Sequence, residues 1–556
     1  MTDERLYLRQ NVQVEPLVDQ WYAWSQLIPP ATAARNITER HLKIMDSYLA
    51  MPGLHASAVK NPKMLGGPFV DYDGKRVDEI RALRDATIRN RSEMLTLSTA
   101  LTELDILLSS AAKGFSLHPL YASVPAPLQG YVELTYDGHH HPSFRLLESL
   151  LYRSRYYQPS AQSLMLSLTT GDDRPFVLST PRLPLPGHVH LPIPFDDERI
   201  DALFRLKSQP QSWAAIRALI DVNHEDEDVW RSFFTSEPPR PYRAYTGSGL
   251  RWRYFGHACV LIETNGVSIL FDPVLSYTYD SQISRYTYLD LPDTIDYVLI
   301  THNHIDHILF ETMLQLRHKV RHIVVGRSST GALHDPSLAL TLRACGFRNV
   351  IELPEGHDIT DGAVTITGLP FLGEHGDLAV GTKLGYLIHA GGESLLFLAD
   401  SCNVEPALYT HIQEQFGDVR VLFIGMECNG APMSWLYGPL LLQKPERAID
   451  ESRRLSGSNY EQAMKIVDTF NVKDVYVYAM GQEPWLNYVM SIKYTEASKP
   501  IVESNRLLSA CRARGITAER LFGEKEVASD APEELRTSWD DPAGIIMSEE
   551  RISGAP

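Results

Sequence analysis

The segment THNHIDH, residues 301–307, places three histidines and one aspartate within six positions, directly after a run of β-forming residues. His302 and His304 are two residues apart, and residues two apart in an extended chain point to the same side. Asp306 and His307 follow where a helix is expected to begin, and from that turn they can reach a second ion. Imidazole and carboxylate groups are common ligands of zinc and of non-haem iron. The spacing therefore predicts a metal site with ligands for two ions.

The elements that position this motif are short apolar runs, separated by helical segments, after residue 249. Alternating and continuous apolar runs are typical of strands in a layered α/β domain. The predicted strands are LRWRYF, CVLIET, SILFDP, DYVLIT, HIVVG, SLLFLAD, VLFIGM and VYVYAM. The predicted helices include PSLALTLRACG and YEQAMKIVDTF. We therefore expect the metal motif at the end of a strand in this domain.

The chain before residue 249 has a different pattern of apolar residues. Apolar residues at helical spacing predict one long helix or two over residues 77–112, and a further helical stretch over residues 197–220. Strand-like pieces lie between them, which makes residues 1–240 an α+β domain. The segment TSEPPRPYRAYTGSG, rich in Pro, Gly, Ser and Thr, marks the boundary. A catalytic domain then covers residues 249–525, and residues 526–556 are expected to be an acidic, loosely ordered tail.

The bulk composition narrows the class of protein. The formal charge of −17 and the isoelectric point near 5.6 argue against nucleic-acid or anionic-membrane partners, because binding to phosphates needs a basic surface. The charged N-terminus and the lack of a long apolar run predict neither a signal peptide nor a membrane span. Five scattered cysteines, never in CxxC spacing, indicate reduced thiols in a cytoplasmic protein.

From residue 249 to about residue 520 the chain resembles the metallo-β-lactamase superfamily. The resemblance is carried by GHACVLIE, by the turn LFDP before the metal motif, by the motif itself and by FLADS after it. It implies an αβ/βα sandwich that holds two metal ions. By the same resemblance, Asp400 in FLADS is the aspartate that bridges the two ions.

Two departures from that superfamily bear on the metal. Where its members place the next histidine ligand, this chain reads GLPFLGEHG, with Glu374 and His375 side by side. Adjacent residues of a strand face opposite ways, so only one of the two is expected to bind metal. No histidine occurs after His411, and Met480 or Gln482 stands where a histidine normally caps the second metal. The second ion is therefore expected to keep an open position.

A glutamate ligand would give three imidazoles and three carboxylates around two ions. One ion would be held by His302, His304, Glu374 and Asp400, and the other by Asp306, His307 and Asp400. Mixed histidine and carboxylate sets with open positions are typical of non-haem iron that activates oxygen, whereas histidine-rich tetrahedral sites suit zinc. The ligand change therefore favours a di-iron oxygenase over a di-zinc hydrolase.

This combination resembles the CmlA-type β-hydroxylases of nonribosomal peptide synthesis, in which a distinctive N-terminal domain accompanies a metallo-β-lactamase-like domain. The family hydroxylates the β-carbon of an amino acid held as a thioester on a peptidyl carrier protein, in antibiotic and other natural-product biosynthesis. The resemblance implies two iron ions, O₂ as co-substrate, and Glu374 and Asp400 as the catalytic residues. Carried over residue by residue, the metal ligands are His302, His304, Asp306, His307, Glu374 and Asp400.

The resemblance also implies partners. The aminoacyl-loaded carrier protein would deliver the substrate, and the N-terminal domain would serve in docking or in forming a homodimer. The sequence contains no P-loop and no G-x-G-x-x-G after a strand, so the two electrons of each turnover are expected from an external reductase.

Two other functions stay open. A di-zinc hydrolase of the same fold would cleave an ester, lactam or phosphodiester, and it requires His375 as the ligand. A scaffold protein would keep the fold without catalysis.

Residues near the motif have two interpretations each. His257 in FGHACV is either a hydrogen-bonding neighbour of the site or a core histidine. Asp272 in LFDP is expected to orient a ligand or cap a turn and not to bind metal. Glu427 in IGMECNG either receives the ammonium group of a substrate or is a solvated loop carboxylate. The histidines of DGHHHPS, residues 137–143, are expected in a structural or surface loop.

Overall fold

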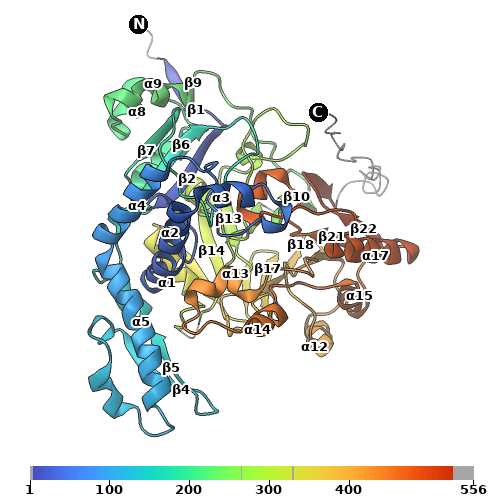
Figure 1. Cartoon of the computed structure of the whole chain (residues 1–556). Helices are drawn as coiled ribbons and strands as arrows, with labels where there is room; N and C mark the ends of the chain where they lie inside the picture. Colours follow the sequence, from blue (N-terminus) through green and yellow to red (C-terminus); the bar gives the residue numbers. More distant parts are fainter. Residues whose placement is uncertain (1–3, 265, 329–330, 530–556) are drawn as a thin grey trace, which may run out of the picture.

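Two seven-stranded sheets dominate the computed structural model, which describes residues 4–264, 266–328 and 331–529 (Figure 1). The sheets face each other across a shared apolar core, and helices cover their outer faces. The αβ/βα sandwich predicted from the sequence is confirmed, and all eight strands predicted for it are present.

The first sheet has the strand order β15-β14-β13-β12-β11-β10-β23. Its strands are β10 (Leu250–Gly256), β11 (Cys259–Thr264), β12 (Val267–Phe271), β13 (Ile295–Leu299), β14 (Val320–Gly326), β15 (Val350–Leu353) and β23 (Lys525–Ala528). Strands β12 to β15 are parallel, so their carboxyl ends lie at one edge of the sheet. Two helices connect these strands, α10 (Phe310–Leu316) and α11 (Leu338–Ala344).

The second sheet has the order β16-β17-β18-β19-β20-β21-β22. Its strands are β16 (Asp358–Asp361), β17 (Val364–Leu369), β18 (Gly385–Ala390), β19 (Glu393–Phe397), β20 (Val421–Gly425), β21 (Asp474–Tyr478) and β22 (Thr517–Arg520). Three helices pack on its outer face, α12 (Pro406–Phe416), α15 (Tyr460–Thr469) and α17 (Lys499–Ala513). Three short helices lie in the connections, α13 (Met433–Tyr437), α14 (Arg447–Ser452) and α16 (Asn487–Met490).

Aromatic side chains fill the space between the sheets. Phe271 of the first sheet stacks on Phe397 of the second with ring centroids 3.9 Å apart, and Phe397 stacks on Phe423 at 4.4 Å. Trp252 meets Phe423 edge-on at 5.1 Å. Such pairs stabilise a core beyond the area they bury, so the two sheets have a fixed relative position at the edge where the metal motif lies.

The N-terminal region is an α+β unit with a four-stranded sheet, β3-β2-β6-β7, a three-stranded sheet, β8-β1-β9, and the hairpin β4-β5. Its strands are β1 (Arg5–Leu8), β2 (Val12–Val18), β3 (Trp21–Tyr22), β4 (Val132–Tyr136), β5 (Pro142–Leu146), β6 (Gln162–Leu168), β7 (His188–Leu191), β8 (Gln211–Ser212) and β9 (Phe234–Thr235). Its helices are α1 (Pro30–Asn36), α2 (Leu42–Ala50), α3 (Pro52–Ala58), α4 (Val77–Asn90), α5 (Ser92–Ala111), α6 (Glu148–Leu151), α7 (Glu198–Arg205), α8 (Trp213–Leu219) and α9 (Glu227–Ser232).

The helix predictions for this region are partly confirmed. Residues 77–112 form two helices, α4 and α5, which part at Arg91. The single helical stretch predicted over residues 197–220 is wrong, because α7 and α8 are separated by a turn and strand β8. Pro210 lies in this break, and proline cannot continue a helix. The triple-histidine segment is the exposed turn between β4 and β5, as predicted.

A buried charge network joins the N-terminal region to the sandwich. Arg174 contacts Glu15 at 2.6 Å and Glu311 of α10 at 2.7 Å. Arg182 contacts the same Glu15 at 3.0 Å, and the hydroxyl of Tyr22 donates to Glu311 at 2.7 Å. One apolar core also runs through both regions. The helix that follows the metal motif is therefore held by residues of the N-terminal region.

The predicted tail needs a correction at its start. Residues 526–528 belong to β23, which pairs antiparallel with β10 and completes the first sheet. The charged residues Lys525 and Glu526 suit an edge strand, and the acidic residues around KEVA made this segment resemble a tail in composition. Residues 530–556 lie outside the described residues. The five cysteines are buried and free, and no described helix is both long and apolar enough to cross a membrane.

Candidate metal centre

The motif residues lie where strands of both sheets end. His302, His304, Asp306 and His307 occupy the turn between β13 and α10, and Asp400 follows β19. Ligand sites of α/β sheets form at the carboxyl ends of parallel strands, which is where these residues meet. The structure brings together all six residues predicted as metal ligands.

The distances divide the residues into three overlapping groups. In the first, His304 Nδ1 lies 3.3 Å from Glu374 Oε1, and both can share an ion with His302. In the second, His307 Nε2 lies 3.0 Å from Asp400 Oδ2, and His302 Nε2 lies 3.9 Å from the same oxygen. His302 is therefore shared by these two groups.

Asp306 belongs to the third group, with His307 and His257. Its Oδ2 lies 3.6 Å from His307 Nε2 and 3.1 Å from His257 Nε2. The division of the six residues between two ions stays a prediction.

Glu374, and not His375, turns toward the histidines. The pair lies in a loop and not in a strand, so alternation along a strand does not separate them. Glu374 has a left-handed backbone with φ of 62°, between glycines that are also left-handed. A Cβ on Gly373 would lie 2.4 Å from Cys402 Cβ. Glycine is therefore needed here for the loop to pack against Cys402, two residues after Asp400. The turn sends the glutamate carboxylate into the cavity.

His375 is buried beside the site without contacting the carboxylates. Its Nδ1 lies 3.1 Å from the carbonyl oxygen of Gly373, and its ring packs against His304 and Phe371. It belongs to none of the groups of side chains close enough to share an ion among the described residues. His375 therefore takes no part in the groups that could hold an ion, although its Nε2 is buried without a hydrogen-bond partner in the described part of the chain.

Each of the three motif histidines uses one nitrogen toward the cluster and anchors the other. His302 Nδ1 lies 3.1 Å from Thr301 Oγ1, His304 Nε2 lies 3.0 Å from the hydroxyl of Tyr437, and His307 Nδ1 lies 2.8 Å from Asp272 Oδ2. Outer partners of this kind fix the ring orientation of metal-binding histidines. Asp272 contacts His307 and also accepts the backbone N–H of Thr301, so its predicted role of orienting a ligand or capping a turn fits its position and stays a prediction. Tyr437 was missed, because nothing in its local sequence links it to the motif.

His257 is a hydrogen-bonding neighbour of the site. Its Nδ1 accepts the N–H of Gly481 at 3.1 Å, so the proton of the neutral ring is on Nε2. That nitrogen lies 3.1 Å from Asp306 Oδ2 and donates to it. A protonated nitrogen cannot bind a metal, so His257 positions Asp306 and is not itself a ligand.

Bound cations would stabilise this cluster of neutral histidines and crowded carboxylates. Burial lowers the pKa of His302 well below its ordinary value and the pKa of His304 to about 4, so both rings are neutral, as metal ligands must be. Burial raises the pKa of Glu374 well above its ordinary value, and the carboxylates of Asp400 and Asp306 raise it further. His302 Nε2 and Asp400 Oδ1 are buried and have no hydrogen-bond partner. Divalent cations would satisfy both atoms and offset the crowded carboxylates, and the mixed donor set suits iron.

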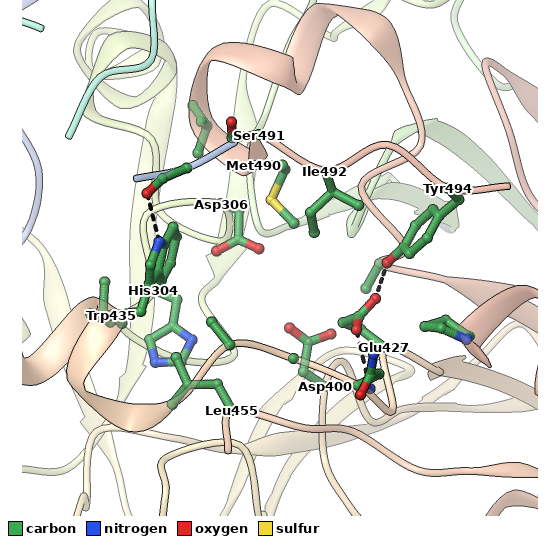
Figure 2. A pocket seen from close by; sticks show the side chains of 18 of the residues that line it. His304, Asp306, Asp400, Glu427, Trp435, Leu455, Met490, Ser491, Ile492 and Tyr494 are labelled. Carbon is green, nitrogen blue, oxygen red and sulfur yellow. Dashed lines mark hydrogen bonds between the residues drawn. The ribbon is translucent and has the colours of Figure 1, made fainter. Parts of the chain in front are cut away.

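One side of the cluster opens into a cavity of about 380 Å³ (Figure 2). Ala479 follows β21 and lines the cavity. Its methyl side chain cannot bind a metal ion. The prediction placed Met480 or Gln482 at this point, but Met480 packs into the core beneath the outer helices. The absence of a capping histidine is confirmed, and a methyl group takes its place.

Apolar side chains make up most of the remaining cavity wall. They include Trp435, Leu436, Leu455, Met490 and Ile492. Leu65 and Gly66 of the N-terminal region also line the cavity, and the carbonyl oxygen of Gly66 accepts the indole N–H of Trp435 at 2.9 Å. The N-terminal region therefore completes the candidate active site.

Comparison with known proteins decides the family. The model of the diiron non-heme β-hydroxylase N-terminal domain matches residues 7–238, and that of the β-lactamase superfamily domain matches residues 268–478. The 4-amino-L-phenylalanyl-[CmlP-peptidyl-carrier-protein] 3-hydroxylase of Streptomyces venezuelae is 40% identical over 526 residues, which cover 93% of this chain and 98% of that protein. This chain belongs to the diiron β-hydroxylase family.

Solved structures agree with this assignment of the diiron β-hydroxylase. The crystal structure of CmlA, a diiron β-hydroxylase from Streptomyces venezuelae, has a TM-score of 0.89 and 39% identity, covering 95% of this chain and all of that one. A CmlA variant with a glutamate-to-aspartate substitution has a TM-score of 0.86 and 38% identity, covering 94% of this chain. The predicted enzyme class, its two iron ions and its co-substrate O₂ are confirmed, and the hydrolase and scaffold alternatives lose their support.

Proposed function

We propose that this diiron β-hydroxylase acts on an amino acid held as a thioester on a peptidyl carrier protein of nonribosomal peptide synthesis. The relative from Streptomyces venezuelae acts on a 4-amino-L-phenylalanyl group carried in this way. The observation that carries the proposal is the carboxylate of Glu374, which faces His304 at 3.3 Å beside an open cavity.

We assign six residues as ligands of the two iron ions. The assignment rests on the three overlapping groups of side chains, on the anchored outer nitrogens of the histidines and on the buried atoms of His302 and Asp400 that have no hydrogen-bond partner among the residues described. Glu374 and Asp400 both line the cavity and would act in catalysis as well. The ligands are His302, His304, Asp306, His307, Glu374 and Asp400.

The reaction inserts one oxygen atom of O₂ into the C–H bond at the β-carbon and releases the other as water, with two electrons and two protons from outside. Bound iron supplies the oxidant, since no side chain can break an unactivated C–H bond by acid or base chemistry. The apolar cavity wall excludes water, and the anchored histidines keep the donor atoms in place. Tethering raises the local concentration of the substrate and limits the reaction to a loaded carrier.

The electron donor and the compartment belong to the same proposal. An external reductase supplies the electrons, since neither a P-loop nor a dinucleotide-binding glycine motif after a strand was found in the sequence. Five free, buried cysteines favour the reducing cytoplasm as the place of action.

A homodimer completes the set of proposed partners. The arm made by α5 and the β4-β5 hairpin projects from the body of the molecule, and Ile106 and Phe115 on it are 61% and 82% exposed (Figure 1). A second copy that covers this arm would bury these side chains. Light scattering of the wild type and of a Phe115→Ser variant tests this assignment, which predicts dimers for the first and a shift toward monomers for the second.

The function is tested with a panel of aminoacyl groups loaded on a carrier protein. The ferrous enzyme, O₂ and a reductant are expected to add one oxygen atom to the β-carbon of at least one tethered amino acid, as measured by mass spectrometry. The corresponding free amino acids are expected to react at least about 100-fold more slowly, because the tether supplies the effective concentration. Release of the acyl group without oxygenation would instead indicate a hydrolase.

A further inference from the structure

We propose that Glu427 is the binding residue for the protonated α-amine of the aminoacyl group. This assignment rests on the proposed function, because only an aminoacyl substrate brings an ammonium next to a β-carbon. It adds a specificity element outside the six assigned metal ligands.

Glu427 belongs to the same cavity as the metal site. It lies two residues after β20, and the cavity lining contains four carboxylates among the residues that the structure describes. Three of these are the ligands Asp306, Glu374 and Asp400, so Glu427 is the remaining one. Figure 2 shows Glu427 and Asp400 on one side of the cavity, with His304 on the other. Glu427 is half-buried in the cavity wall and belongs to the loop after β20, so both of its sequence-based interpretations stay predictions.

The carboxylate of Glu427 is held by two hydrogen bonds but forms no ion pair with the described residues. The hydroxyl of Tyr494 donates to Oε2, and the backbone N–H of Asn429 donates to Oε1 at 3.2 Å. No lysine, arginine or histidine within the described part of the chain forms an ion pair with it. A carboxylate has about four lone-pair positions, so at least one per oxygen stays available for a further donor.

A buried carboxylate without a cation is costly, which is why such groups in proteins are normally paired. Burial raises the pKa of Glu427 to about 7, although the N–H of Asn429 and the charge of Arg454 act in the opposite direction, and a cation in direct contact would restore its ionised form. Lys493 and Lys499 also line the cavity, but both are exposed at its rim and neither pairs with Glu427. The missing partner therefore has to enter the cavity with a ligand.

The chemistry of an aminoacyl thioester supplies such a partner. Its α-amine has an ordinary pKa of about 7.7 to 8.0 and is largely protonated at neutral pH. The amine and the β-carbon are attached to the same α-carbon, so the group that binds the ammonium also sets which β-hydrogen faces the metal site. Tyr494 keeps the Glu427 carboxylate in place for this contact, as Figure 2 shows.

The test compares two probes that differ only in the amine, L-phenylalanyl-pantetheine and 3-phenylpropanoyl-pantetheine, on the ferrous holoenzyme without oxygen. We expect the wild type to bind the amino probe about 10- to 100-fold more tightly, in line with a buried charge-assisted hydrogen bond. Glu427→Gln is expected to reduce this ratio to below about threefold, while the affinity for the des-amino probe stays within about threefold of the wild type.

The matched control is Glu414→Gln, which removes a carboxylate on α12 that pairs with His411 outside the cavity and should keep the full ratio. If Glu427→Gln does not fold, Glu427→Asp takes its place, and withdrawal of the carboxylate by one methylene must also lower the ratio. A wild type without preference for the amine, or a Glu427 variant that keeps the preference, overturns the proposal. The proposed function is judged separately, by hydroxylation of a carrier-bound amino acid by the wild type.

Discussion

Oε1 of Glu374 lies 3.3 Å from Nδ1 of His304, whereas the adjacent His375 turns its Nδ1 toward its own loop. This difference decides the chemistry of the site, because it replaces an imidazole with a carboxylate beside an uncapped second metal position. Mixed donor sets of this kind are typical of iron that reacts with oxygen.

Glu374→Ala and His375→Gln form a matched pair of neighbouring substitutions. The first removes a proposed ligand, so we expect bound iron to fall below two per chain and hydroxylation to fall at least about 100-fold. The second changes a ring that contacts no carboxylate, and we expect less than about a tenfold loss of activity. Metal analysis and the rate of carrier-bound hydroxylation measure both. Equal losses from the two variants would contradict the assignment of Glu374.

Asp272→Asn tests the orientation of His307. Asp272 Oδ2 lies 2.8 Å from His307 Nδ1 and also accepts the hydroxyl of Thr301 at 2.7 Å. An asparagine can present its amide hydrogens to the ring, which would turn the histidine or change its tautomer, so we expect a 10- to 100-fold loss in iron affinity. Iron titration followed by absorption measures the affinity, and circular dichroism reports whether the fold is kept. An unchanged affinity would show that Asp272 does not orient the ligand.

Arg174→Met tests the buried network between the N-terminal region and α10. The substitution leaves Glu311 without a cation, while Glu15 keeps Arg182, and breaking a buried pair on one side costs about 3–5 kcal/mol. Arg174 also lies over the ring of Tyr488 at 3.5 Å, next to Val489 and Met490 of the cavity wall. We therefore expect a loss of this size in the free energy of unfolding, measured with urea.

The control for this network is Arg348→Met, which breaks an ion pair with Glu198 whose side chains are both about 80% exposed. Surface pairs contribute about 0–1 kcal/mol, so this variant should unfold almost like the wild type. Similar effects from the two substitutions would mean that the network does not stabilise the contact between the regions.

Glu148 predicts a pH dependence of stability away from the metal site. Burial raises its pKa to about 7 from an ordinary value of 4.5, although the N–H of Ser337 donates to it. The folded protein therefore holds this proton more tightly than the unfolded chain, and the free energy of unfolding falls as pH rises from 4.5 to 7.

Comparison with Glu148→Gln isolates this contribution. The stability of the wild type minus that of the variant should fall by about 1–3 kcal/mol between pH 5 and pH 8, and it should be constant above pH 8. Urea unfolding at several pH values measures the difference. A difference that rises with pH would mean that Glu148 is ionised and stabilised by its surroundings.

Much of this site is predictable from the sequence because it is local. His302, His304, Asp306 and His307 lie within six positions, and their strand and turn are recognisable from an apolar run. Asp400 follows a strand with a clear apolar pattern, but its role as a ligand was predicted from the resemblance to the metallo-β-lactamase superfamily.

The remaining features depend on contacts between distant segments. Tyr437 reaches His304 across 133 positions, and Gly66 lines a cavity built mainly by the second half of the chain. Glu374 points into the cavity because its backbone is left-handed, between glycines that are also left-handed. A strand was assumed at this position from the sequence, and a strand does not contain such a turn. Strand β23 was not predicted, because an edge strand needs few apolar residues and the residues around it are acidic.

The most direct test of the central claim is a single turnover of the fully reduced, iron-loaded enzyme with labelled dioxygen and a carrier-bound amino acid that it hydroxylates. The account predicts two irons per chain and one labelled oxygen atom on the β-carbon of the tethered product. Zinc in place of iron, or a product without oxygen derived from O₂, would contradict it.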